Sequence, residues 1–246
     1  MLQAYGKDSI LLDVGANIGS HLLFAAAKGH SVWGVEPQTI NLVKMYQAAL
    51  MDATNSRITF LQNTLDKDYL KVYIKQTLGN IGGSYVMNEA GGDSSLEQIQ
   101  SVLLSDVIKH IQFNKRQTEN LTIIMKVDIE SYECRAFLGS PLVLNSTHSG
   151  FYIPYVVMEW TYAQGKQPPY KYPAACPRKS VVHMTNLFTA NGYIPFSKNR
   201  IMLNPNTSDT WKADVIWQHK NAHQLFFDKG RYLLRQTTQT KREDAR

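Results

Sequence analysis

The first sixty residues alternate short apolar runs with segments of helical composition, and this alternation constrains the fold more than any other feature. The apolar runs are Ile10–Val14, Ser31–Val35 and Ile58–Leu61, each of the length and composition of a buried strand. Residues 20–28 and 39–51 between them favour helices. Strands that alternate with helices in this way form a parallel sheet with right-handed crossovers. We therefore predict an α/β fold with a Rossmann-like, mostly parallel, doubly wound sheet.

Later segments predict the rest of this sheet. Residues 121–127 form the strongest β run of the chain, and residues 155–158 form a second buried run. Residues 193–196 and 213–217 are expected to pair as antiparallel strands at the C-terminal end of the fold. Residues 70–75 alternate in polarity, so they favour one more strand.

Two irregular segments are expected to line the acceptor pocket. Residues 78–93 are rich in Gly, Asn and Ser and predict a loop or flap. Residues 165–178 interleave prolines with aromatic residues, which favours either a surface loop or a lid over the substrate. No linker or repeat divides the chain, so we predict a single domain over residues 1–246 with a frayed basic tail at 228–246.

Charge and cysteine content bound the environment of the protein. The net charge of +6 is scattered, without the basic stripe that a nucleic-acid partner would need. Cys134 and Cys176 have no metal-ligand spacing and predict no disulfide framework, and Cys134 is expected to be a small core residue. The sequons at Asn120, Asn145 and Asn206 are about as many as chance would give. No apolar run could span a membrane. We expect a cytoplasmic location by default, or a secretory lumen if the chain is part of an anchored protein.

The sequence DVGANIG, residues 13–19, carries the first functional signal. It follows directly on the first strand, where an open parallel sheet binds its ligands. Gly15 permits a tight turn, Asn17 tolerates a left-handed conformation, and Gly19 permits close packing of the helix. We expect the turn to offer backbone N–H groups to a ligand. We also expect Asp13 to order the loop and to receive a ligand's ammonium group.

The glycine spacing argues against a dinucleotide or a nucleotide sugar. A G-x-G-x-x-G turn would place glycines where Asn17 and Ser20 stand. Glu36, which ends the second strand about twenty residues after the turn, can accept hydrogen bonds from both hydroxyls of a ribose. NAD proteins use an acid at the same place, but the combination of Asp13, this glycine spacing and Glu36 with Pro37 favours S-adenosylmethionine.

Three motifs together resemble the FkbM-type methyltransferases. These motifs are DVGANIG at residues 13–19, Glu36 with Pro37, and KVDIESYE at residues 126–133. The family's pattern reads roughly DVGANIG, then EP, then K-I/V-D-V/I-E-G-Y/F-E, and then a strand that ends in Glu, which Glu159 matches. The resemblance extends from Ile10 to about Gln218, and the third motif is its most specific part.

This resemblance implies transfer of a methyl group from the cofactor S-adenosyl-L-methionine, usually to a hydroxyl oxygen of a small molecule or glycan. No metal is expected, and the oligomeric state is left open. The residues expected to bind the cofactor are Asp13, Gly15, Ala16, Asn17, Gly19, Glu36, Pro37, Asn63 and Asp128. Asn63 is included because it follows the third strand with Gln62 and Thr64, near the expected adenine site.

Three strand-end carboxylates are the catalytic candidates. Asp128 is expected to position the donor or the acceptor, and Glu130 or Glu159 to act as the base. The alternative for Glu130 is that it caps the following helix with Glu133. Ser131 replaces the family's usual Gly, and we expect it to start this helix as an N-cap. The alternative function is a catalytically inactive Rossmann-like module that binds a cofactor or a partner.

Overall fold

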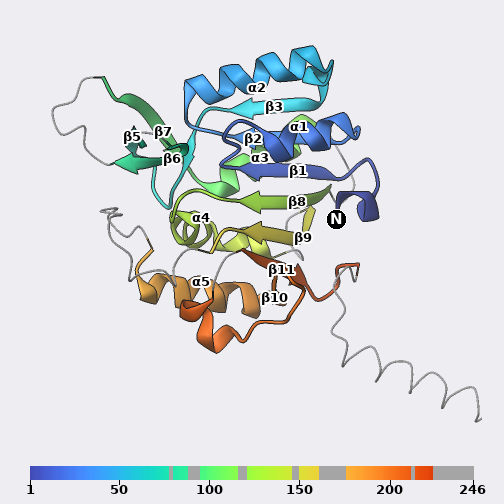
Figure 1. Ribbon diagram of the computed structural model, residues 1–246. Helices are drawn as coiled ribbons and strands as arrows, with labels where there is room; N and C mark the ends of the chain where they lie inside the picture. Colours follow the sequence, from blue (N-terminus) through green and yellow to red (C-terminus); the bar gives the residue numbers. More distant parts are fainter. Residues whose placement is uncertain are drawn as a thin grey trace, which may run out of the picture.

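The computed structural model describes residues 1–77, 80–87, 95–115, 121–145, 150–160, 176–211 and 214–223. Its central sheet has seven strands in the order β10-β11-β9-β8-β1-β2-β3 (Figure 1). The strands are β1 (Ile10–Val14), β2 (Ser31–Val35), β3 (Ile58–Leu61), β8 (Leu121–Val127), β9 (Phe151–Met158), β10 (Tyr193–Ser197) and β11 (Val215–His219). Strands β1, β2, β3, β8 and β9 pair in parallel, whereas β11 is antiparallel to β9 and β10. The predicted sheet and its closing antiparallel pair are confirmed.

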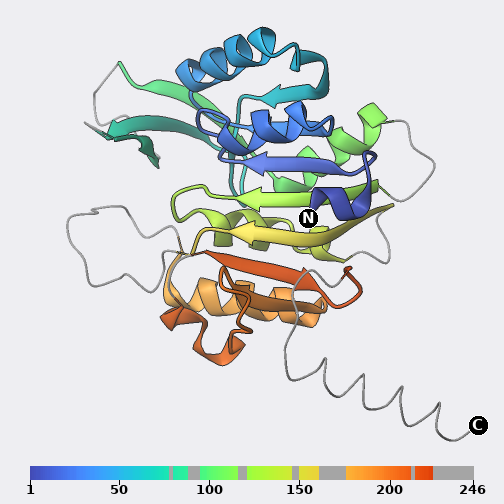
Figure 2. The ribbon, with the colours of Figure 1, turned by 45° about the vertical axis from the view of Figure 1, so that its right-hand side comes forward.

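Helices cover both faces of this sheet, as a doubly wound fold requires (Figure 2). The side chains of Ile10, Leu12 and Val14 belong to a core shared with α3 (Leu104–Lys115), α4 (Glu133–Gly139) and α5 (Arg178–Ala190). Leu11 points to the opposite face, where it packs with α1 (Ser20–Ala27) and α2 (Thr39–Met51). All five residues of β1 are buried, so this strand lies at the centre of the fold.

A small second sheet lies beside the carboxyl end of β2 and β3. It contains β4 (Thr64–Leu65), β5 (Lys71–Thr77), β6 (Asn80–Met87) and β7 (Glu97–Val102), in the order β4-β7-β5-β6. Strand β5 confirms the predicted strand at 70–75. The prediction of a loop over all of 78–93 is wrong, because β6 pairs with β5 in antiparallel fashion. This pairing uses backbone groups, so the glycines of β6 do not prevent it.

The two cysteines form a disulfide, which corrects the prediction that they would not. Cys134 lies in α4, and Cys176 lies two residues before α5. They are 42 positions apart in the sequence, a spacing that carries no signal of a disulfide. They meet because α4 and α5 pack next to each other on one face of the sheet. Cys134 is buried as predicted, but as half of a cross-link.

Short 3-10 turns complete the described fold: η1 (Leu2–Tyr5), η2 (Asn55–Arg57), η3 (Pro141–Leu144) and η5 (Pro205–Thr210). None of the helices in the described ranges is long and apolar enough to cross a membrane. The predicted lid lies outside the described residues except for 176–178, and the predicted basic tail lies outside them entirely.

Candidate functional site

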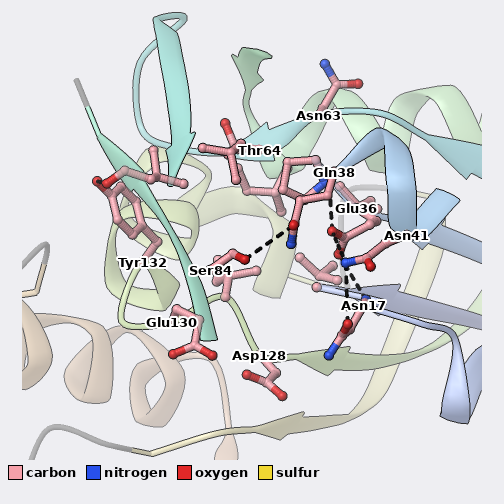
Figure 3. Close-up of a pocket in the computed structure, with 18 residues that line it drawn as sticks. Asn17, Glu36, Gln38, Asn41, Asn63, Thr64, Ser84, Asp128, Glu130 and Tyr132 are labelled. Atoms are coloured by element: carbon pink, nitrogen blue, oxygen red, sulfur yellow. Dashed lines mark hydrogen bonds between the residues drawn. The ribbon is translucent and has the colours of Figure 1, made fainter. Parts of the chain in front are cut away.

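A cavity opens at the carboxyl ends of β1, β2 and β8, where an open parallel sheet binds its ligands (Figure 3). The second sheet closes its other side with Ile74, Ser84 and Val86. Figure 3 shows Glu36 with Gln38 and Asn41 on one side of the cavity, and Asp128 with Glu130 on another. The full lining is Val14, Gly15, Asn17, Val35, Glu36, Pro37, Gln38, Asn41, Asn63, Thr64, Leu65, Ile74, Ser84, Val86, Asp128, Ile129, Glu130 and Tyr132.

The turn after β1 is shaped by close packing. Gly15 has φ +74°, and a Cβ there would lie 1.7 Å from the carbonyl oxygen of Asp128. Gly19 has φ +86°, and a Cβ there would lie 2.8 Å from Cγ of Met45. Asn17 has the predicted left-handed conformation, with φ +50°. These conformations bring the end of β1 into direct contact with the end of β8.

The backbone N–H groups of this turn were predicted to face a ligand, but three of them donate to carbonyl groups of the protein. The N–H groups of Gly15 and Ala16 both donate to the carbonyl oxygen of Val35, at 2.9 and 3.1 Å. The N–H of Gly19 donates to the carbonyl of Ala16 at 2.8 Å. These three amides are therefore used within the protein. Ala16 and Gly19 support the turn from behind and do not line the cavity.

Glu36 organises the cavity as well as lining it. Its carboxylate is 3% exposed and accepts hydrogen bonds from the N–H of Asn17 at 2.9 Å and of Gln38 at 3.1 Å. Asn41 Nδ2 donates to the same carboxylate at 3.1 Å. Burial raises the pKa of Glu36, and these three donors oppose that rise. Oε2 accepts only the Asn17 N–H among these bonds, so it keeps a lone pair for a ribose hydroxyl.

Lys126 is a site residue that sequence reasoning missed. Its Nζ donates to the carbonyl oxygen of Gly15 at 2.8 Å and forms ion pairs with Asp13 and Asp128, each at 3.4 Å. Asp13 is fully buried beneath the turn and does not line the cavity. Burial raises the pKa of Asp13, against the attraction of Lys126. The ammonium group beside Asp13 is that of Lys126, which in turn contacts the turn at Gly15, and the ordering of the loop by Asp13 stays a prediction.

The three candidate catalytic carboxylates lie close together at the ends of β8 and β9. Burial, followed by the charges of Asp128 and Glu133, raises the pKa of Glu130 to about 7. Burial and the adjacent Asp128 raise the pKa of Glu159 to about 8. Asp128 lines the cavity described above and also a second hollow beside α1, which Glu159 and Lys126 line as well. Neighbouring carboxylates with raised pKa values are typical of proton-transfer sites.

The backbone after Asp128 has a conformation that favours glycine at position 131. Glu130 has φ +54° and Ser131 has φ +75°, so both lie in the left-handed region. Ser131 is therefore not the predicted N-cap, and α4 begins at Glu133 with Tyr132 at the capping position. Glu133 is buried and accepts a hydrogen bond from the N–H of Ile129 at 2.9 Å. This bond holds the loop before α4 and does not cap the helix at Tyr132, and Glu130 lines the cavity.

The expected adenine side of the cavity is built partly from the predicted residues. Asn63 and Thr64 line it, although Nδ2 of Asn63 donates to the carbonyl of Gln100 at 3.1 Å. Gln62 instead donates to Thr39 at 2.6 Å and does not line the cavity. Apolar walls come from Leu65, Ile74 and Val86, which suit a flat aromatic ring. All three lie on strands of the second sheet, which the motifs do not mark.

These residues fit S-adenosylmethionine. A buried carboxylate at the end of β2 suits a ribose hydroxyl, and Leu65 and its apolar neighbours suit the adenine. Asp128 supplies negative charge beside the turn for the ammonium group of the methionine part. Within the described ranges, no group of three His, Cys, Asp or Glu residues is arranged to hold a metal ion.

Comparison with known proteins gives the family. Residues 13–195, most of the chain, match the family described as "Methyltransferase FkbM domain". No curated protein sequence matches the chain.

Three solved structures are similar to the chain at low sequence identity. The FkbM methyltransferase of Methylobacillus flagellatus KT is 18% identical with a TM-score of 0.47, over 85% of this chain and 44% of that protein. A putative O-methyltransferase from Klebsiella pneumoniae is 8% identical with a TM-score of 0.45, over 86% and 73% of the two chains. An O-methyltransferase from Bacillus cereus, in complex with SAH, is 9% identical with a TM-score of 0.43, over 86% and 74%.

The chain spans less than half the length of the Methylobacillus protein. The family match covers all three motifs of the site, from Asp13 through Glu36 to the carboxylates after β8 and β9. The chain belongs to the FkbM methyltransferase family, and its predicted cofactor S-adenosylmethionine is confirmed with it.

Proposed function

We propose that this protein transfers a methyl group from S-adenosylmethionine to a hydroxyl oxygen of a small molecule or glycan. The observation that carries this proposal is the position of Asp128, which lines both the cofactor cavity and the hollow that contains Glu159. A hydroxyl that enters from the second hollow would meet the methyl group beside these two carboxylates.

The cofactor supplies a methyl group that its sulfonium charge already activates, so the protein must align the acceptor and accept one proton. Glu159 is the base in this proposal. Its pKa of about 8 makes its carboxylate a better proton acceptor than an ordinary glutamate, and it lies with Asp128 at the hollow. The bound cofactor would supply its methyl group to the hydroxyl oxygen and leave as S-adenosylhomocysteine, while Glu159 would accept the hydroxyl proton. Lys126 forms an ion pair with Asp128 at 3.4 Å and so helps to hold this side chain in place.

The test is formation of S-adenosylhomocysteine from S-adenosylmethionine in the presence of methyl glycosides and simple phenols as acceptors. Product whose new methyl group is on oxygen supports the proposal. Titration of the protein with S-adenosylhomocysteine, with NAD as the control, distinguishes an active methyltransferase from the alternative of an inactive module. Micromolar binding without turnover on any acceptor would favour that alternative.

Glu159→Gln is expected to lower turnover by about 100-fold or more, because the amide cannot accept the hydroxyl proton. Affinity for S-adenosylhomocysteine should stay unchanged, since Glu159 does not line the cofactor cavity. The matched control is Asp214→Asn, which removes an exposed carboxylate at the edge of the same hollow. If Glu130→Gln lowers turnover and Glu159→Gln does not, Glu130 is the base instead.

The raised pKa values predict opposite effects of pH on activity and stability. Turnover should rise between about pH 6 and pH 9, as Glu130 and Glu159 ionise with pKa values of about 7 and about 8.

Both folded pKa values exceed that of an unfolded glutamate, so the folded state binds more protons above pH 4.5. The free energy of unfolding should therefore fall as pH rises from about 5 to 8. Thermal unfolding across this range checks the sign, and Glu159→Gln should flatten the slope.

A further inference from the structure

The disulfide carries information about where the protein folds. The chain contains two cysteines, and both are consumed by the Cys134–Cys176 bond. Both residues are buried, at 1% and 7% exposure. Structural disulfides persist in oxidising compartments and are rare in the cytosol, where thiols are kept reduced. A cross-link buried between two helices of the core therefore indicates folding in an oxidising compartment.

The disulfide joins the two segments of the chain that follow the candidate catalytic carboxylates at the ends of β8 and β9. Cys134 lies in the helix after Glu130, and Cys176 precedes Arg178, which forms an ion pair with Asp209 at 2.6 Å. Asp209 lies on the turn η5, and Nε1 of Trp160 donates to the carbonyl of Ser208 on the same turn at 2.8 Å. The turn η5 therefore contacts α5 through the Arg178–Asp209 ion pair and contacts Trp160, the residue after Glu159, through the hydrogen bond to Ser208.

Asn206 projects from this anchored turn. Asn206, Thr207 and Ser208 form a sequon, and Asn206 and Thr207 are exposed while Ser208 is buried. The backbone N–H of Asn206 donates to Oδ1 of Asn204 at 3.1 Å, which fixes the start of the turn. Its side-chain amide has no hydrogen-bond partner in the described part of the chain. The sequons at Asn120 and Asn145 include residues outside that part, so Asn206 is the site the structure supports.

We propose that Asn206 is an N-glycosylation site of a chain that folds in an oxidising secretory compartment. The disulfide and the exposed sequon are independent features, and each is expected of a protein made in that compartment. Figure 1 shows α5 and β10 at the edge of the sheet opposite α2, and η5 packs on α5, so η5 lies away from Glu36 at the end of β2. A glycan there leaves the cavity open.

The chemistry needs two co-reactants from the compartment. The amide Nδ2 of Asn206 bonds to the anomeric carbon of an oligosaccharide carried on a lipid pyrophosphate. The bond between that carbon and the pyrophosphate breaks, the amide loses one proton, and the lipid pyrophosphate leaves. The thiols of Cys134 and Cys176 pass two electrons and two protons to a protein disulfide that is reduced in exchange.

The test uses the natural protein, isolated from the cells that make it and alkylated with N-ethylmaleimide before reduction. We expect no alkylation of Cys134 or Cys176. Peptide-N-glycosidase in heavy-oxygen water should convert Asn206 to a labelled Asp, which mass spectrometry of the tryptic peptide reads directly. This readout does not depend on methyltransferase activity.

Variants provide the matched comparison. Asn206→Gln should abolish the glycan completely, whereas Thr207→Ala keeps the sequon at an exposed position and should retain it. An unlabelled Asn206 in the natural protein overturns the proposal, even with the disulfide intact. Alkylated thiols in that protein overturn the assigned compartment as well.

Discussion

Glu36→Gln is expected to weaken binding of S-adenosylhomocysteine by about 100-fold, the cost of losing a charged hydrogen bond to a ribose hydroxyl. The substitution keeps the size of the side chain but replaces one acceptor oxygen with an NH₂ group. Both carboxylate oxygens of Glu36 already accept hydrogen bonds. Oε2 accepts from Asn17, and Oε1 accepts from Gln38 and Asn41. An amide must therefore turn a donor towards a donor, whichever way it is placed.

Isothermal titration with S-adenosylhomocysteine measures this effect. The matched control is Glu97→Gln, because Glu97 also accepts a hydrogen bond from a backbone N–H, that of Thr39, but lies outside the cavity. Affinity should stay near that of the parent in this control. An unchanged affinity in Glu36→Gln would remove Glu36 from the ribose site, and thermal unfolding of both variants separates lost binding from lost folding.

The sheet could be predicted from the sequence because its strands carry their own signal. Residues 10–14, 31–35, 58–61 and 121–127 are apolar runs, and the structure has strands at these same bounds. Strand β6 has no such signal, since its glycines suit a loop equally well and only its pairing with β5 makes it a strand. The disulfide was missed for a related reason, because α4 and α5 become neighbours only in the folded chain.

In the candidate site too, some residues could be predicted from sequence motifs and others depend on contacts that form only in the folded chain. Gly15, Asn17, Glu36 and Asp128 stand in motifs at strand ends, and the topology of the sheet brings those ends together. Lys126 was missed because its role depends on reaching Asp13 across the β1–β8 pair. The hydrogen bonds of the Gly15 and Ala16 N–H groups could not be predicted either, because their acceptor, the carbonyl of Val35, belongs to the next strand.

Gly15→Ala is expected to cause the largest loss of stability of any substitution proposed for this protein. The new Cβ would lie 1.7 Å from the carbonyl oxygen of Asp128, where backbone rather than a flexible side chain must move. Overpacking of this kind, added to a left-handed φ of +74°, should cost about 4 kcal/mol of the free energy of unfolding. Because the movement separates β1 from β8, it should also displace Asp128 and abolish cofactor binding.

The control for this effect is Gly29→Ala, which separates backbone strain from the close approach. Gly29 also has a left-handed φ, of +90°, but nothing lies within 4 Å of a Cβ placed there. Its substitution should cost about 1–2 kcal/mol from strain alone and leave cofactor binding intact. Urea unfolding of the two variants gives the difference, which is the cost of forcing β1 and β8 apart. If Gly15→Ala loses no more stability than Gly29→Ala, then the glycine after β1 is not required by the contact with β8, and its place in the motif must be explained by the ligand instead.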